Sequence, residues 1–320
     1  MSLERAYQFA RRTNVLVLPA VLMGVEIAVF LAVSPFADSS EILASMSQAQ
    51  FVGTLALFSI MPPYFLCMVT LQRLRTEESL AEMADLLEPT SAARVQGCIA
   101  GIHPAGWFLV VLGAVFGGYQ NEEFIRRVGA SGTLNAMDVA FVLANCFVWA
   151  AIAFVLSWRL PISLALSRLG AQMKVDVYRL DRLRPLARIA TLDILVVAGA
   201  MALMPLQSLD AEFRIYNYNY GIIVGVPSAI VLFVLPLWGV RGNIGDRKAD
   251  RVAVLQAKLD VVDRNDVAAV EALSAHIERL RGLSNWPVDL RLATRIFAYV
   301  IIPPLAWVGA ALVEILIDRL

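Results

Sequence analysis

Seven apolar stretches, each about as long as a bilayer-crossing helix, most strongly limit how this chain can fold. A membrane-spanning helix needs about 20 mostly apolar residues, and its backbone groups must be paired within the segment. Apolar residues make up 59% of the 320 residues, so we expect an all-α integral membrane protein with seven transmembrane helices. The expected spans are residues 15–33, 51–71, 98–119, 136–158, 190–209, 220–240 and 295–316.

The positions of Lys and Arg predict the orientation of these helices. The chain has 27 such residues, and nearly all lie in the N-terminus or in alternate gaps between the apolar stretches. The other gaps hold only Arg126, Arg127, Arg214 and Arg319. Because positive charge marks the cytoplasmic side, we expect the N-terminus inside and the C-terminus outside. These features fit a multi-pass protein of the cell membrane, specifically of a bacterial-type inner membrane.

The longest polar gap, residues 243–285, carries an interrupted helical pattern. Apolar residues recur there every three or four positions on both sides of a polar interruption: Val252, Leu255, Leu259, Val262, Val270, Leu273, Ile277 and Leu280. This pattern favours two helices that meet at a turn. We therefore expect a six-span bundle with short cytoplasmic helices (1–242), a cytoplasmic helical hairpin (243–290), and a seventh helix packed on the bundle (291–320).

Two shorter cytoplasmic segments also have helical features. Thr76 precedes two glutamates, which is typical of an N-cap, so we expect a helix to begin there and to end at Pro89. Residues 175–188 place apolar side chains such as Val177 and Leu183 among arginines. This pattern indicates a basic amphipathic helix on the inner leaflet, and a short loop with positive charge explains it equally well.

Glu26 is the strongest candidate for an ion site because it lies near the centre of the first apolar stretch. A charge at that depth costs about 2.5–3.5 kcal/mol on insertion scales, so Glu26 should face a bundle interior, a partner or a water-filled cavity. It is either a proton or cation site, or a protonated side chain that makes one interhelical hydrogen bond.

Five further polar residues in the apolar stretches are candidates for an ion or proton pathway: His103, Asp138, Asn145, Asp193 and Glu314. His103 can change charge near neutral pH, or it can donate to a carbonyl freed by the following proline. Asp138, Asp193 and Glu314 lie near the ends of spans, where they can equally cap helices or reach the headgroups. We expect Asn145 to join helices rather than to bind substrate.

Four prolines near the middles of two spans are candidate hinge or gate residues: Pro62, Pro63, Pro303 and Pro304. Each adjacent pair removes two N–H donors and frees carbonyls about four residues earlier. Broken helices at mid-membrane can mark a transporter site or a gate. The alternative is an ordinary kink whose carbonyls are satisfied by neighbouring groups.

The sequence leaves two classes of function. It contains no recognisable catalytic, nucleotide-binding or metal-binding motif, so we expect neither enzyme activity nor a cofactor. Its zero net charge argues against a nucleic-acid partner. The first hypothesis is an ion channel or small-ion transporter in the lipid bilayer that uses Glu26. The second is a membrane-anchored sensor, scaffold or assembly partner, in which the hairpin binds a cytoplasmic protein at 243–285.

Spaced glycine pairs suggest close contacts between helices. Gly113 and Gly117, and Gly221 and Gly225, are each separated by three residues, a spacing that lets two helices approach closely. Such contacts can form within one subunit or in a homo-oligomer, and we expect contacts within one subunit.

Overall fold

The structure is a computed structural model that describes most of the chain. The described residues are 7–8, 14–40, 42, 46–101, 104–122, 125–126, 135–208, 219–263, 266–287, 294 and 298. All regular elements within them are helical, and six helical segments are long and apolar enough to cross a membrane. These helices are compatible with a multi-pass membrane protein. The predicted seventh span, 295–316, lies almost entirely outside the described residues, so the count of seven and the orientation stay predictions.

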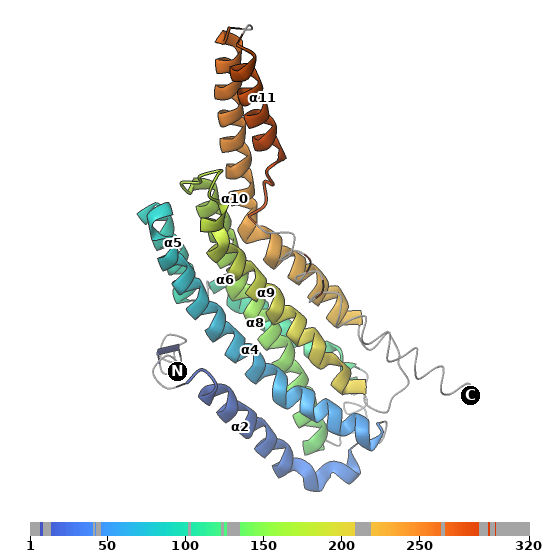
Figure 1. Ribbon diagram of the computed structural model, residues 1–320. Helices are drawn as coiled ribbons and strands as arrows, with labels where there is room; N and C mark the ends of the chain where they lie inside the picture. Colours follow the sequence, from blue (N-terminus) through green and yellow to red (C-terminus); the bar gives the residue numbers. More distant parts are fainter. Residues whose placement is uncertain are drawn as a thin grey trace, which may run out of the picture.

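The long helices run side by side, and each reverses the direction of the one before it (Figure 1). In chain order the elements are α2 (Val17–Val33), η1 (Ser34–Ser39), α4 (Gln48–Glu82), η2 (Ala84–Leu86), α5 (Pro89–Ala100), α6 (Pro104–Tyr119), α8 (Ala136–Gln172), η3 (Leu180–Leu183), α9 (Arg184–Leu203), η4 (Met204–Ser208), α10 (Asn219–Val261) and α11 (Val267–Gly282). The end of α10 and the antiparallel α11 project from one end of the bundle, here called the hairpin end. The opposite end is called the far end.

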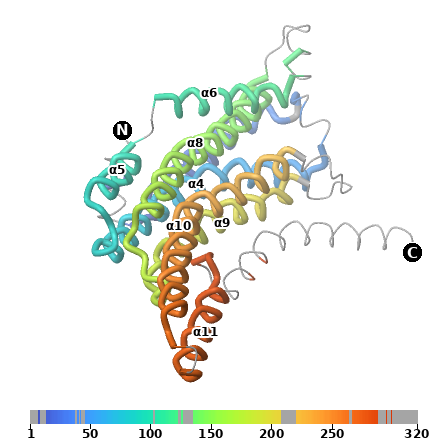
Figure 2. The backbone as a smooth tube through the Cα atoms, turned by 90° about the horizontal axis from the view of Figure 1, so that it is seen from above, coloured from blue at the N-terminus to red at the C-terminus, as the bar shows by residue number. Residues whose placement is uncertain are grey.

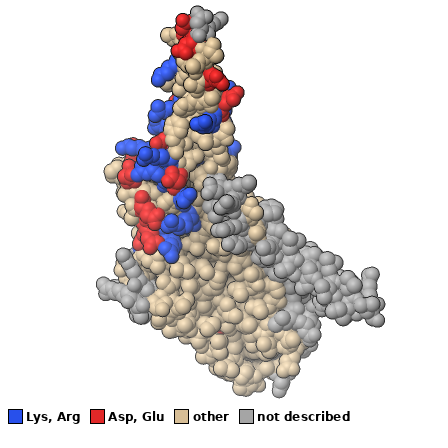
Figure 3. All heavy atoms as spheres, in the orientation of Figure 1, with Lys and Arg blue, Asp and Glu red and all other residues tan. Residues whose placement is uncertain are grey.

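Charged side chains are concentrated at the hairpin end. Figure 3 shows them over the projecting α10–α11 pair and the neighbouring helix ends, whereas the described surface toward the far end is free of them in this view. Arg241 lies near this boundary, with its guanidinium 5.1 Å from the ring of Trp238 and 5.0 Å from that of Trp286. Tryptophan is enriched at membrane–water interfaces, so this cluster is placed as an interfacial anchor would be.

The helices extend well beyond the apolar stretches from which they were predicted. α8 has 37 residues, which corresponds to about 55 Å at the usual helical rise. α10 is continuous through residues 242 and 243, where the sequence analysis placed a domain boundary. The expected span at 98–119 instead belongs to two helices, since α5 ends at Ala100 and α6 begins at Pro104. Figure 2 shows α5 set apart from α6, which runs beside α8.

Two local predictions for the hairpin end are wrong. Thr76 is not an N-cap, because α4 begins far upstream, where the Ser47 side chain accepts from Gln50 N at 3.1 Å. The segment 175–188 is not one amphipathic helix on a leaflet. It contains a non-helical start, η3 and the beginning of α9, and Val177 and Leu183 are buried. In both cases packing against the bundle determines the local structure.

Glycines allow α8 to approach its neighbours closely. A Cβ on Gly239 of α10 would lie 1.7 Å from the carbonyl oxygen of Ser167, and one on Gly113 of α6 would lie 2.6 Å from that of Trp149. Association of helices in lipid depends on such packing. The Gly113 and Gly117 pair therefore serves contact within the subunit. α2 packs at the edge of the bundle, against α4 and α8.

Candidate functional site

A buried ion pair joins α8 to α9 inside the bundle. Arg159 Nε donates to Asp193 Oδ1 at 2.7 Å, and Gln72 Nε2 of α4 donates to the same oxygen at 2.8 Å. The three residues are each 0% exposed. Buried charges carry a large desolvation cost, and an ion pair offsets it only with good geometry and further hydrogen bonds. Charged residues inside membrane proteins commonly mark ion or substrate pathways.

Thr76 extends this network along α4. Arg159 Nη1 donates to Thr76 Oγ1 at 3.2 Å, and that hydroxyl donates to the Gln72 carbonyl at 2.6 Å. Asp193 Oδ2 and Gln72 Oε1 are also buried, and neither has a hydrogen-bond partner among the described residues. Three helices therefore build a polar centre that retains unused acceptor oxygens.

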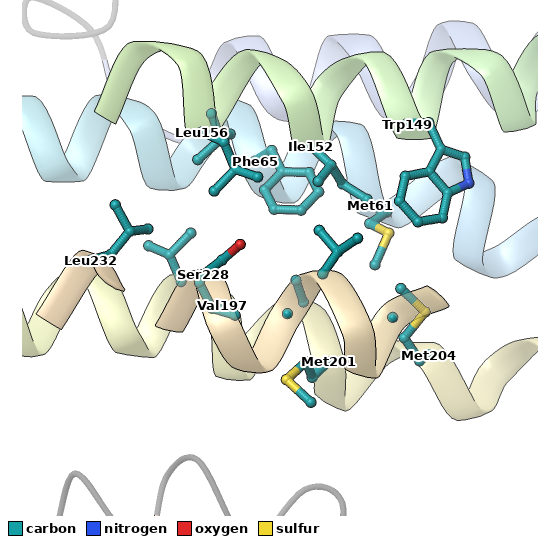
Figure 4. Close-up of a pocket in the computed structure, with 16 residues that line it drawn as sticks. Met61, Phe65, Trp149, Ile152, Leu156, Val197, Met201, Met204, Ser228 and Leu232 are labelled. Carbon is teal, nitrogen blue, oxygen red and sulfur yellow. The ribbon is translucent and has the colours of Figure 1, made fainter. Parts of the chain in front are cut away.

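An apolar cavity of about 50 Å³ lies next to this polar centre, toward the far end. α4, α8, α9 and α10 line it with side chains that include Met61, Phe65, Trp149, Ile152 and Val197 (Figure 4). The hydroxyl of Ser228 points into it from α10. Leu156 and Val196 line the cavity. Arg159 comes three residues after Leu156 on α8, and Asp193 comes three residues before Val196 on α9. Because the two helices run in opposite directions, both charged residues lie about one helical turn, or about 5 Å, from the cavity lining toward the hairpin end.

A polar groove of about 370 Å³ adjoins the apolar cavity at the far end. Gln120 Oε1 accepts from Trp149 Nε1 at 2.8 Å and from Asn145 Nδ2 at 3.2 Å. Glu122 and Gln207 also line the groove. Met61, Trp149 and Ile152 are among the residues that line both spaces, so the two are neighbours. The groove, the cavity and the ion pair therefore follow one another along the same group of helices.

Glu26 lies in a different groove, of about 500 Å³, between α2, α4 and α8. Both of its carboxyl oxygens are buried without a hydrogen-bond partner in the part of the chain that the structure describes. Val25, Leu143 and Phe147 line this groove and are exposed on the outer surface of the bundle. Phe58 lines both this groove and the far-end groove. Glu26 therefore faces the edge of the bundle, and the structure does not bring it to Asp193.

Asp138 joins the start of α8 to the segment between α2 and α4 at the far end of the bundle. Its side chain is 2% exposed, and its Oδ1 accepts from Ser40 Oγ and from Ile42 N. Asn135 caps α8, because its Oδ1 accepts from Met137 N at 2.8 Å. Its Nδ2 donates to Phe36 O. The cap of α8 is therefore Asn135, and the described bonds of Asp138 join the start of α8 to residues that precede α4.

Of the other residues selected from the sequence, Asn145, Pro62 and Pro63 lie within described helices. Asn145 Nδ2 donates to Gly117 O at 2.9 Å, which joins α8 to α6 and also places Asn145 at the far-end groove. Pro62 and Pro63 lie within α4, which stays helical through both. The remaining candidates lie outside the described residues: His103, Glu314, Pro303 and Pro304.

Sequence reasoning missed most of the polar centre. It selected Asp193 but treated Arg159 as an ordinary cytoplasmic charge and Thr76 as a cap. One signal was available: Arg159 and Asp193 have opposite charge and lie at the same end of consecutive spans. The spacing of Gln72 and Thr76, one helical turn apart, also places both on one face of a helix.

No protein-family model, curated protein or solved structure matches this chain. The site must therefore be interpreted from its own geometry.

Proposed function

We propose that the chain is a channel or transporter that moves a small ion across the membrane through the α4, α8, α9 and α10 bundle. The observation that supports this proposal is the order of three features along these helices. A polar groove at the far end shares lining residues with an apolar cavity, and the buried Arg159–Asp193 pair lies about one helical turn beyond the lining of that cavity. None of these features requires an enzyme reaction.

The apolar cavity has the properties of a closed hydrophobic gate. Apolar cavities stay dry, and hydrophobic constrictions block ions because water leaves them. On the hairpin side of the ion pair, Met83, Ile162, Leu166 and Leu186 are fully buried, and they close the path there. The conformation described here is therefore proposed as a closed one, open only to the far-end groove.

Liposome flux measurements test this proposal with two neighbouring residues of α10. Val224 lines the apolar cavity, whereas Ile223 is 65% exposed on the outer surface. Val224→Asn should hydrate the gate and raise ion flux through the purified full-length chain above the wild-type rate. Ile223→Asn, which adds the same polar group facing lipid, should leave the rate unchanged. Equal rates in wild type, both variants and empty liposomes, for K⁺, Na⁺, H⁺ and Cl⁻ alike, would refute transport.

The same assay separates two carboxylates as the ion site. Asp193 lies at the end of the cavity path, whereas Glu26 lines the groove beside α2. We therefore propose that flux is lost in Asp193→Asn and kept in Glu26→Gln. The opposite result would move the ion site to the α2 groove, as the sequence alone suggests.

The sensor or scaffold hypothesis ranks second. The α10–α11 pair projects from the bundle (Figure 1), and Val261 and Val267 at its tip are 86% and 68% exposed. Of the patterned apolar residues of α11, Ile277 and Leu280 are buried, whereas Val270 and Leu273 are half-buried. The apolar surface left for a cytoplasmic partner therefore lies mainly toward the tip.

A further inference from the structure

Four oxygen atoms in the interior of the bundle lack a hydrogen-bond partner among the described residues: Asp193 Oδ2, Gln72 Oε1, Ser163 Oγ and Ser79 Oγ. Their residues are at most 1% exposed. Buried polar groups without a partner are rare in folded proteins, and each asks for an ordered water or an ion.

The two serines depart from the usual behaviour of hydroxyls in helices. Ser and Thr side chains commonly donate to a carbonyl about one turn earlier. Thr70 and Thr191 do so here, at 3.0 and 2.8 Å, and Ser157 donates to Phe154 O at 3.0 Å. Ser79 and Ser163 do not, so their hydroxyls are available to water or to a proton in transit.

Three of the four atoms, Gln72 Oε1, Ser79 Oγ and Ser163 Oγ, belong to α4 and α8, whose contact is here called the seam, and Asp193 of α9 adjoins it through its hydrogen bond from Gln72. Gln72, Thr76 and Ser79 recur at the spacing of one helical face, and Arg159 and Ser163 do the same on α8. The hydrogen bond from Arg159 Nη1 to Thr76 Oγ1 brings the two faces together. From Gln72 to Ser79 the seam extends about 10 Å toward the hairpin end.

We propose that the ion moved by this protein is a proton, which binds to Asp193 Oδ2 and travels along the seam through ordered waters. This inference rests on the proposed transport function. In uptake, an O–H bond of a hydronium ion from the far-end side breaks and an O–H bond to Asp193 Oδ2 forms, which turns Asp193 into a neutral acid. The neutral acid bonds more weakly to Arg159, whose guanidinium keeps its charge. The O–H bond then breaks, and the proton passes to water held by Gln72, Ser163 and Ser79. No other reactant is consumed.

The charges around Asp193 favour a proton over a metal cation. Arg159 of α8 faces it directly, while α4 contributes the neutral Gln72 and Thr76. α10 has no charged residue between Asn219 and Arg241, and the nearest charge before Asp193 on α9 is Arg188. A fixed guanidinium repels a metal cation, which also needs several oxygen ligands. A proton needs only one carboxylate oxygen.

Proton flux into liposomes that contain a pH-sensitive dye tests the seam. The full-length chain is reconstituted, a pH gradient is imposed, and the membrane potential is clamped with K⁺ and valinomycin. Wild type should pass protons, Asp193→Asn should lose this flux, and Ser79→Ala with Ser163→Ala should lower it several-fold. Ser157→Ala is the matched control, because Ser157 is buried on α8 but its hydroxyl has a partner. This control should keep the wild-type rate.

The outcomes separate the two proposals. Passage of K⁺, Na⁺ or Cl⁻ without protons would overturn the proton assignment and leave ion transport standing. Passage of no ion would overturn both. If Asp193→Asn does not assemble, the double serine variant decides, because an unchanged proton rate in that variant contradicts the seam.

Discussion

Arg159 Nε donates to Asp193 Oδ1 over 2.7 Å, with the two side chains 1% and 0% exposed. Removal of one partner from a buried ion pair leaves the other charge without compensation and costs about 3–5 kcal/mol. A guanidinium cannot lose its proton in a protein, whereas a carboxylate can gain one. We therefore predict that Asp193→Leu lowers the unfolding temperature in detergent more than Arg159→Met does.

Replacement of both Arg159 and Asp193 tests their pairing more directly than either single replacement does. Apolar residues of similar volume often replace a buried ion pair without loss of stability, so Arg159→Met with Asp193→Leu should be more stable than Asp193→Leu alone. Arg168→Met is the control, because Arg168 is exposed on the same helix, and it should change stability by less than about 0.5 kcal/mol. A double variant as unstable as Asp193→Leu would contradict the pairing.

The long apolar helices were largely predictable from the sequence, whereas the polar centre was not. Apolar length alone places a helix start at Ala136, where α8 begins. It cannot show that α8 continues through Arg159 to Gln172, because Arg159 ends the uninterrupted apolar stretch and Pro161, a residue that commonly ends a helix, follows it. Only the packing of this extension among its neighbours turns a surface arginine into a fully buried one.

Gly239 should tolerate no side chain. A Cβ there would overlap the Ser167 carbonyl oxygen at 1.7 Å, whereas a Cβ on Gly242 of the same helix meets nothing within 4 Å. Overpacking costs about 1–3 kcal/mol, so Gly239→Ala should lower the unfolding temperature. Gly242→Ala should raise it, since Ala in a helix interior is favoured over Gly by about 0.5–1 kcal/mol. Equal effects in both variants would rule out close contact between α8 and α10 as the cause.

Glu122 at the far-end groove should concentrate cations near the proposed path. It is exposed three residues after the end of α6 and lines the groove. Surface charges act over about 10 Å at 0.1 M salt and about 3 Å at 1 M. We therefore predict that Glu122→Gln lowers proton flux in dilute buffer and has no effect in concentrated salt. Glu271→Gln on α11, remote from the groove, should match wild type at both salt concentrations. A salt-independent decrease in Glu122→Gln would indicate a role other than attraction.

Local sequence signals failed where tertiary contacts decide the structure. Thr76 followed by two glutamates has the pattern of a helix start, yet α4 already extends from Gln48 through this point. The bond that Thr76 accepts from Arg159 depends on a residue of another helix. A window of neighbouring residues contains no information about such a partner.

Lys248 should hold α11 against α10. Its Nζ donates to Arg281 O and Leu283 O, each at 2.8 Å, and to Asn285 Oδ1 at 3.3 Å. Lys248→Met would leave these acceptors to water, so amide hydrogens of α11 should exchange faster while those of α8 keep their rate, because local opening depends on local contacts. Lys258→Met removes an exposed lysine of the same helix and should leave both rates unchanged. If α11 exchanges at the wild-type rate in Lys248→Met, packing of Ile277 and Leu280 alone must hold the helix in place.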